Sequence, residues 1–202
     1  KHDDPANLAD AVYGIPELFR KDLPGATLVA NPGCYPTAAA LAIAPLLSHS
    51  LVKTDRIIIN AASGITGAGK SPKAALHFPE ANQGYHAYGE IAGHRHQPEI
   101  GQTLSRIAGH AVEPLFVPHL LPVDRGILET IYLEPHDPDV TEEELIDACV
   151  DAYSGEPFVR LRDTPPNIKH VVGTNFCDLS VRLASVGDTK TVVVVAAEDN
   201  II

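Results

Sequence analysis

The residues best suited to chemistry are a cysteine and a histidine pair: Cys34, His94 and His96. Cys34 stands in the run Asn-Pro-Gly-Cys-Tyr-Pro-Thr, residues 31–37, and Pro36 fits the first turn of a helix. A thiol at a helix N-terminus meets free backbone N–H groups and the helix dipole, which favour a thiolate. An ordinary thiol has a pKa near ~8.5, so a decrease of about two units makes the thiolate predominant at neutral pH. We predict a nucleophile with a lowered pKa, the alternative being a buried structural cysteine.

His94 and His96 flank Arg95 just before a helix that Pro98 is expected to open. An imidazole titrates near neutrality and can move a proton both ways in one turnover, while a guanidinium can hold an anion. The pair alone fits a structural role equally well, and the cysteine motif favours catalysis. A metal site is the other alternative, with one of three further histidines: His77, His86 or His119. No carboxylate or cysteine cluster has ligand spacing, so no metal is predicted.

A glycine-rich segment follows a predicted strand, and residues 64–71 spell the P-loop pattern G-x-x-x-x-G-K-S. A true P-loop continues into a helix, whereas Pro72 and Pro79 prevent one here. We therefore predict an anion or cofactor cradle made of backbone N–H groups, or a tight turn, rather than a nucleotide triphosphatase. Arg125 lies in a loop from which it can reach a substrate anion, although a surface arginine in a turn is the commoner arrangement.

Composition limits the class of protein. The chain has 202 residues, of which 45% are hydrophobic, and a formal net charge of -11. A charge of this sign repels nucleic acid and anionic lipid, and a phosphorylated substrate would need a local positive site. The apolar runs, such as residues 191–197, are far shorter than the ~20 residues of a membrane helix. Three cysteines without metal-type spacing, among them Cys149 and Cys177 as packing residues, favour a reducing compartment.

Strand and helix patterns predict an α+β domain, a mixed, largely antiparallel sheet with helices on one face. Helices are expected from Pro36, from Pro98, and from Thr141 to about Gly155, where Thr141 and Glu144 form a capping box. Gly187 and Asp188 are expected to turn a hairpin. Strands are predicted at residues 26–31, 56–62, 112–117, 127–133, 176–184 and 190–197.

Taken together, these motifs resemble the N-acetyl-gamma-glutamyl-phosphate reductases of arginine biosynthesis, relatives of aspartate-semialdehyde dehydrogenase and glyceraldehyde phosphate dehydrogenase. The resemblance spans nearly the whole chain, although Lys70 stands where an arginine is more usual. It rests on segments in the family's order: Tyr-Gly-Ile-Pro-Glu (13–17), Pro-Gly-Cys-Tyr-Pro-Thr (32–37), Ser63-Gly64 with Gly67-Ala-Gly69, His-Arg-His-x-Pro-Glu (94–99), Arg-Gly-Ile-Leu-Glu-Thr (125–130) and Glu-Asp-Asn (198–200).

The resemblance implies NADPH-dependent reduction of N-acetylglutamyl 5-phosphate to N-acetylglutamate 5-semialdehyde and phosphate, through a cysteine thioester. Cys34 would be the nucleophile and His96, rather than His94, its acid-base partner. The same resemblance assigns substrate binding to Arg95, Arg125 and Ser63, and contacts with NADP(H) to Ser63, Gly64, Gly67 and Asn200.

The resemblance also implies a domain organisation. Residues 1–202 are expected to be the catalytic and dimerisation domain, like the C-terminal domain of glyceraldehyde phosphate dehydrogenase, of a cytoplasmic or plastid-stroma homodimer or homotetramer. We expect a longer polypeptide with an N-terminal Rossmann cofactor domain and a final helix outside this chain. Alternatives are an aspartate-semialdehyde dehydrogenase-type reductase, a Cys-His acyltransferase or hydrolase, and a noncatalytic oligomerisation module.

Overall fold

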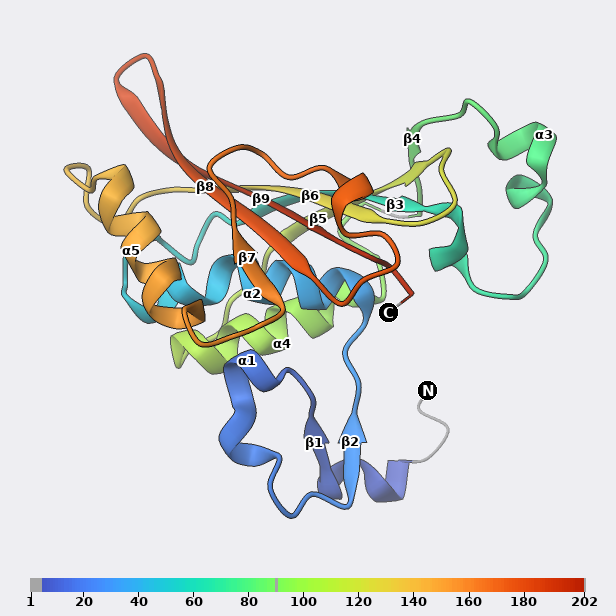
Figure 1. Cartoon of the computed structure of the whole chain (residues 1–202), viewed down its shortest axis with the longest axis horizontal. Coiled ribbons are helices and arrows are strands. Elements are labelled where there is room, and N and C mark those ends of the chain that lie inside the picture. The colour runs from blue at the N-terminus through green and yellow to red at the C-terminus, as the bar shows by residue number, and fades with distance from the viewer. Residues whose placement is uncertain (1–4, 90, 202) are drawn as a thin grey trace.

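A seven-stranded mixed sheet forms the centre of the structure, a computed structural model that describes residues 5–89 and 91–201 (Figure 1). The β3–β5 and β7–β8 pairings are parallel and the other four are antiparallel, which confirms the predicted α+β class. In order across the sheet the strands are β4 (His86–Ala87), β5 (Leu115–Leu121), β3 (Ile58–Gly64), β6 (Ile127–Leu133), β9 (Thr189–Glu198), β8 (Cys177–Val186) and β7 (Val159–Leu161).

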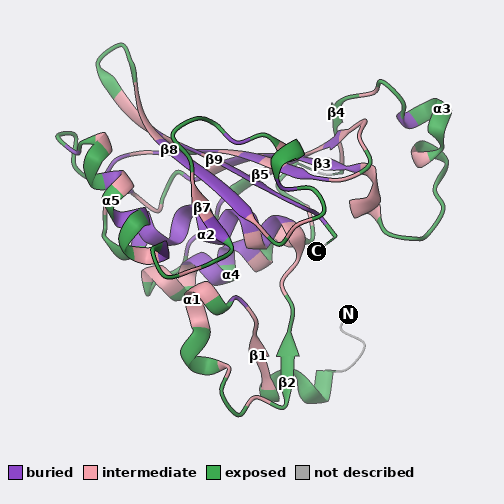
Figure 2. Cartoon of the chain, in the orientation of Figure 1, coloured by how far each residue is buried: buried purple, intermediate pink, exposed green. Residues whose placement is uncertain are grey.

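Three helices cover one face of this sheet. They are α2 (Cys34–Ser48), α4 (His96–Ala108) and α5 (Glu142–Tyr153). The α2 helix lies between the sheet and α4, and its residues 38–47 are all buried, which explains an alanine-rich sequence without a polar face (Figures 1 and 2). Strand β6 shows the sidedness of the sheet, because Ile131 is buried and Tyr132 is 37% exposed. The prediction of helices on one face is therefore confirmed.

A second, small sheet lies apart from the first. It pairs β1 (Ala11–Tyr13) with β2 (Leu28–Ala30) in parallel, through the short helices α1 (Pro16–Phe19) and η2 (Arg20–Asp22). The helix η1 (Pro5–Asp10) precedes it. The strand predicted at residues 26–31 is thus present but outside the main sheet, since its residues are exposed and its only strand partner in residues 5–89 and 91–201 is β1.

The chain after β3 forms an extension beside β4, seen at the right of Figure 1. It contains only short elements: η3 (Ile65–Ala68), η4 (Ala74–Leu76) and α3 (Phe78–Ala81). No long helix follows Lys70, as the two prolines of this segment predicted, so the P-loop reading fails structurally.

The predicted turns and caps are present where the sequence signals were strongest. Gly187 has a φ of 61° and joins β8 and β9 as a hairpin. Thr141 accepts from the Glu144 backbone N–H, and the Glu144 carboxylate accepts from the Thr141 N–H, so the capping box is confirmed. The remaining short helix, η5 (Ile168–His170), lies in the connection from β7 to β8.

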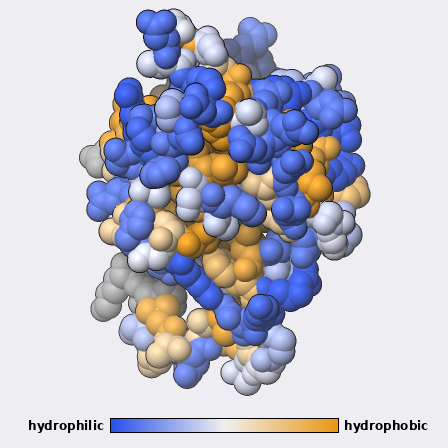
Figure 3. Space-filling view, turned by 90° about the vertical axis from the view of Figure 1, so that its left-hand side faces the viewer, coloured by the Kyte–Doolittle hydropathy of each residue, from blue (hydrophilic) through white to orange (hydrophobic). Residues whose placement is uncertain are grey.

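The surface at the α5 end is mostly hydrophilic, with apolar side chains in a band down its middle (Figure 3). Within the described ranges, every helix is too short or too polar to cross a lipid bilayer.

Candidate active site

Cys34 is the first residue of α2 and lies where two cavities meet. The Gly33 backbone is extended and offers no side chain to cap the helix. The histidine-side cavity, of about 500 Å³, is lined by Ser63, Lys73, Tyr88, His94, Arg95 and His96 among others. The carboxyl-side cavity, of about 380 Å³, is lined by Thr37, Cys177, Glu198, Asp199 and Asn200 among others. The predicted nucleophile is therefore open to a ligand from two directions.

His96 lies directly against the backbone that precedes Cys34. A Cβ atom added to Gly33 would lie 2.7 Å from His96 Nε2, so only glycine leaves room for the imidazole. His96 is also the first residue of α4, a helix that begins two residues before the predicted start at Pro98. The Gln97 N–H donates to the His94 carbonyl over 3.0 Å and forms that extra turn.

Glu99 fixes this arrangement. Its Oε1 atom accepts from the Gly33 N–H over 2.9 Å and from the Tyr13 hydroxyl over 2.8 Å. One carboxylate oxygen therefore joins α4, the cysteine loop and β1. The motif containing Glu99 was recognised in the sequence, but nothing in one sequence indicates that residues 33 and 99 touch.

His94 is placed further from the cysteine loop than His96. Its Nδ1 accepts from the His96 backbone N–H over 3.2 Å, and its Nε2 lies 3.5 Å from the Tyr88 hydroxyl. Tyr88 in turn lies 3.2 Å from the Tyr35 hydroxyl. The two imidazole centroids are 5.0 Å apart. His94 is thus held in a hydrogen-bonded chain, whereas the buried Nδ1 of His96 has no protein partner among the described residues.

Electrostatics at Cys34 contradict the predicted lowering of its pKa. Burial, with smaller contributions from Glu198 and Glu129, raises the pKa of the thiol to about 11, although the backbone N–H groups of Tyr35 and Cys34 act in the lowering direction. The helix N-terminus acts in the predicted direction, but desolvation is larger. The sequence could not indicate how deeply the thiol is buried.

The pKa values of His94 and His96 are lowered, in contrast to that of Cys34. Burial, the neighbouring His94 and Arg95 lower the pKa of His96 to about 4, against the opposing effect of Glu99. Burial and Arg95 also lower the pKa of His94. In the described chain, the resting state is accordingly a neutral thiol beside a neutral imidazole.

The glycine-rich segment provides a tight wall of the histidine-side cavity. A Cβ atom at Gly67 would lie 2.8 Å from Ser63 Oγ and 3.1 Å from Asn200 Nδ2, and one at Gly64 would lie 2.7 Å from the Asp124 carbonyl oxygen. Ser63 Oγ donates to the Gly64 carbonyl over 3.1 Å. Ser63, Gly64 and Gly67 therefore line the same cavity as Cys34, and their contact with a ligand stays a prediction.

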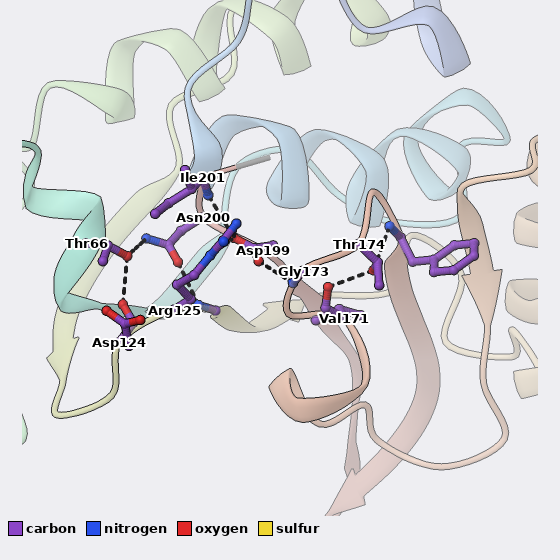
Figure 4. Close-up of polar contacts among 11 residues, drawn as sticks. Thr66, Asp124, Arg125, Val171, Gly173, Thr174, Asp199, Asn200 and Ile201 are labelled. Atoms are coloured by element: carbon purple, nitrogen blue, oxygen red, sulfur yellow. Dashed lines mark hydrogen bonds and ion pairs between the residues drawn. The ribbon is translucent and has the colours of Figure 1, made fainter.

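Arg125 is placed differently from Arg95 and Ser63, the other two residues predicted to bind substrate. Its Nε and Nη2 atoms donate to Asp199 Oδ1 over 3.1 and 2.9 Å, and it lines neither cavity at Cys34 (Figure 4). Asn200 lies in the same cluster, where Oδ1 accepts from the Gly126 N–H over 2.6 Å and Nδ2 donates to Thr66 Oγ1 over 3.0 Å. Arg125 and Asn200 thus organise the end of β9, and direct ligand contact by Arg125 stays a prediction.

Two side chains of this site were missed in the sequence. Lys73 and Tyr88 both line the histidine-side cavity, where Lys73 and Arg95 are the cationic side chains. Both come from the irregular extension between β3 and α4, and a lysine or tyrosine in such a segment has no sequence signal that separates it from surface residues. Among residues 5–89 and 91–201 no three His, Cys, Asp or Glu residues group as metal ligands would.

Solved structures define the class of fold. Aspartate semialdehyde dehydrogenase II from Vibrio cholerae matches with a TM-score of 0.71 and 15% identity, over 95% of this chain and 64% of that one. The aspartate semialdehyde dehydrogenase from Francisella tularensis matches with a TM-score of 0.71 and 14% identity, over 96% and 67%. At this identity the likeness concerns the fold.

Sequence comparisons give the family. The model described as semialdehyde dehydrogenase, dimerisation domain, matches residues 34–200, so the chain belongs to that family. A curated relative named N-acetyl-gamma-glutamyl-phosphate reductase from Pelotomaculum thermopropionicum is 50% identical over 96% of this chain and 56% of its own length. One of the same name from Symbiobacterium thermophilum is 46% identical over 100% and 58%. The chain thus spans little more than half of these relatives.

Proposed function

We propose that the protein containing this chain is an N-acetyl-gamma-glutamyl-phosphate reductase of arginine biosynthesis, with Cys34 as its nucleophile and His96 as its acid-base residue. The observation that carries the proposal is the close approach of the His96 imidazole to Gly33, where a Cβ atom would lie 2.7 Å from Nε2, next to a thiol that begins a helix and lines the same cavity. The relatives that share this name support the substrate.

The residues divide the chemistry among them. His96 accepts the thiol proton, and the Cys34 sulfur attacks the acyl carbon, so that a C–S bond forms and the bond to the phosphate oxygen breaks. Free N–H groups at the start of α2 face the developing oxyanion. Lys73 and Arg95 hold the departing phosphate in a chain whose net charge of -11 otherwise repels it. Because the neutral pair dominates at rest, substrate binding must favour the ionised one.

The reduction of the thioester carbonyl carbon would take its hydride from bound NADPH. The cavity fits this group in that Ser63, Gly64 and Gly67 line it together with Cys34, and glycine at 64 and 67 lets the loop pack closely there. Ser63, Gly64, Gly67 and Asn200 would hold its nicotinamide end. His96 donates a proton to the thiohemiacetal oxygen and recovers it when the C–S bond breaks and the aldehyde leaves.

The remaining residues of the whole protein would supply a Rossmann cofactor domain and a final helix, consistent with the share of the relatives that this chain spans. The half-exposed face of the main sheet, with Tyr132 at its surface, would form the dimer contact, in line with the dimerisation domain family. A bacterial cytoplasm suits the source of the relatives better than a plastid stroma.

The first test is the reverse reaction, phosphate-dependent reduction of NADP by N-acetylglutamate semialdehyde, in the protein containing this chain. Cys34→Ser should abolish the rate and Cys149→Ala, a buried cysteine of α5, should retain it. His96→Asn should lower kcat by about 10²- to 10⁴-fold, the usual contribution of a general acid-base group. A matched His110→Asn variant, at an exposed position, should keep full activity.

The alternatives predict different outcomes. If the protein turns over aspartate semialdehyde but not N-acetylglutamate semialdehyde, the proposed mechanism is retained and the proposed substrate is rejected. Thioester hydrolysis without any nicotinamide requirement would indicate a Cys-His hydrolase or acyltransferase. Unchanged activity in Cys34→Ser would reject every mechanism in which Cys34 forms a covalent bond to the substrate.

A further inference from the structure

The side chain of Asn200 is anchored at both ends of its amide group. Its Oδ1 atom accepts from the Gly126 N–H over 2.6 Å, and its Nδ2 atom donates to Thr66 Oγ1 over 3.0 Å (Figure 4). Gly126 lies in the connection from β5 to β6, and Thr66 belongs to η3, directly after β3. The amide therefore ties the end of β9 to two neighbouring loops.

The hydrogen bonds of Thr66 determine which end of this amide is the donor. The Thr66 hydroxyl donates to the Asp124 carbonyl oxygen over 2.7 Å, so it has no hydrogen left for Asn200 and can only accept from it. A backbone N–H only donates, so the Gly126 contact must be made with the amide oxygen. Both neighbours thus require the same orientation of the Asn200 amide.

The backbone around Asn200 is fixed separately, by the buried carboxylate of Asp199. Oδ1 of this carboxylate accepts from the Ile201 N–H over 3.0 Å and from the Arg125 guanidinium. Oδ2 accepts from the Gly173 N–H over 2.6 Å. Because these bonds hold the chain on both sides of residue 200, the amide group is the part that its own partners still have to place.

Asn200 lies between the two cavities that meet at Cys34. It lines the carboxyl-side cavity, whereas Gly67 lines the histidine-side cavity. A Cβ atom at Gly67 would lie 3.1 Å from Asn200 Nδ2, so the two residues pack directly against each other. Thr66 precedes Gly67 in the chain but lines neither cavity. Any influence of Thr66 on a ligand must therefore pass through the residues that it holds.

We propose that Thr66 is a positioning residue, which directs one N–H of the Asn200 amide toward an acceptor atom of NADP(H) beside Cys34. An amide nitrogen carries two hydrogens, and Thr66 accepts one of them. The second is left for a ligand, and a carbonyl oxygen is the kind of group that it suits. Without the Thr66 hydroxyl, the amide would pivot on the Gly126 bond alone. This inference rests on the proposed contact between Asn200 and the cofactor.

The test is NADP binding by the protein containing this chain, measured by isothermal titration calorimetry without aldehyde, together with the KM for NADP in the reverse reaction. Thr66→Val keeps the branched shape and removes the hydroxyl. It should raise the Kd and the KM for NADP about three- to tenfold, the range for one uncharged hydrogen bond. The KM for N-acetylglutamate semialdehyde should not change.

Two matched variants show whether the hydroxyl is responsible. Thr66→Ser keeps the hydroxyl and should return both NADP constants close to the parent values, a rescue that a purely steric role of the side chain would not give. Thr189→Val removes a hydroxyl that donates to a backbone carbonyl in the β8–β9 hairpin, and it should change neither constant. If valine prevents folding, Thr66→Ala removes the same hydroxyl and should give the same loss.

A double-mutant cycle separates positioning from a general loss of structure. Asn200→Ala removes the amide and should weaken NADP binding at least as much as Thr66→Val does. If Thr66 acts through Asn200, the double variant should bind NADP no more weakly than Asn200→Ala alone. Independent effects that multiply in the double variant would overturn the proposal, and so would unchanged NADP binding in folded Thr66→Val.

The outcome is separable from that of the proposed function. If Asn200→Ala weakens NADP binding and Thr66→Val does not, the cofactor contact stands and positioning by Thr66 is rejected. If neither variant changes NADP binding while the parent still turns over, both the contact and the positioning role are rejected and the reductase function stands. A parent that does not bind NADP would reject the proposed function and this inference with it.

Discussion

The N-termini of α2 and α5 differ in how their backbone N–H groups are capped: α5 has a side-chain cap and α2 has none. In α5, the Thr141 hydroxyl accepts from the Glu144 N–H in the first turn, and the Glu144 carboxylate accepts from the Thr141 N–H, at the protein surface. In α2, Gly33 stands at the cap position without a side chain, and the helix is almost entirely buried. The N-terminus of α5 is therefore capped by side chains of its own segment, whereas the N-terminus of α2, where Cys34 is the first residue, has no side-chain cap.

This difference shows that a helix N-terminus at a candidate site can lack the cap that stabilises a helix elsewhere in the same chain. An uncapped N-terminus forgoes about 0.5–2 kcal/mol of stability, but it keeps N–H groups free for a ligand or an oxyanion. The packing of α2 under the sheet and against α4 makes that loss tolerable. The following predictions test the comparison, from the largest effect to the smallest.

Gly33→Ala should have the largest effect. Its backbone φ of -69° suits alanine, so the change is steric, and it drives a Cβ to 2.7 Å from His96 Nε2. A displacement of about 1 Å at a reacting group can cost about 10²-fold in rate, and we expect a loss of kcat of that order. Steady-state kinetics with circular dichroism as a folding check make the measurement. Gly155→Ala, which meets open space, is the control, and an equal loss there would refute the steric explanation.

Glu99→Gln should reduce both stability and activity. The amide keeps the size of the side chain but weakens acceptance from the Gly33 N–H and the Tyr13 hydroxyl. We expect about 1–3 kcal/mol of lost unfolding free energy, the cost of disturbing buried hydrogen bonds to a charged group, measured by urea denaturation. Tyr13→Phe removes one of the two bonds and should cost less. Equal costs for both variants would mean that the Gly33 contact contributes nothing.

Thr141→Ala should affect stability alone. Removing the capping hydroxyl should cost about 1 kcal/mol, because the Glu144 N–H loses its acceptor. Thermal unfolding measures the cost, and kcat should stay at the parent value. A change in turnover would show that α5 influences the site and would break the contrast with α2.

The pH dependence of stability should reveal His96. Its folded pKa of about 4 lies below the ordinary value of 6.5, so the unfolded chain takes up this proton first. Stability should therefore decrease as pH falls from about 6.5 toward 4, with His94 contributing in the same direction. Denaturation midpoints across this range should fall less steeply in His96→Asn than in the parent. A slope identical in both would exclude a neutral buried His96.

The sequence predicted the elements that carry strong local signals. The capping box, the Gly187 hairpin and the strand at residues 127–133 were correctly placed, because each depends on residues close in the chain. The strands β1, β4 and β7 were missed, since they have only two or three residues and too little alternation to detect. The contribution of β2 to a separate sheet was missed for another reason, because pairing partners are tertiary information.

The sequence brought Cys34, His94 and His96 together as candidates, and the structure has all three line one cavity, while their catalytic roles stay predictions. The predicted direction of the Cys34 pKa was wrong. The main cause is the burial of the thiol in the folded core, with smaller contributions from Glu198 and Glu129, which lie on strands that pair only in the folded sheet. Residue type and spacing thus identify groups capable of chemistry, whereas burial and distant charges set their ionisation.

The strand order has a consequence for biosynthesis. Strand β9 lies between β6 and β8, and β8 and β7 reach the rest of the main sheet only through it. A ribosome delivers β9 after every other described strand, so until then β6 keeps an open edge and β7 and β8 have no sheet to join. Such unpaired edges favour aggregation. The thiol at residue 34 therefore waits for more than 160 residues of synthesis before the end of β9, which lines one of its two cavities, arrives beside it.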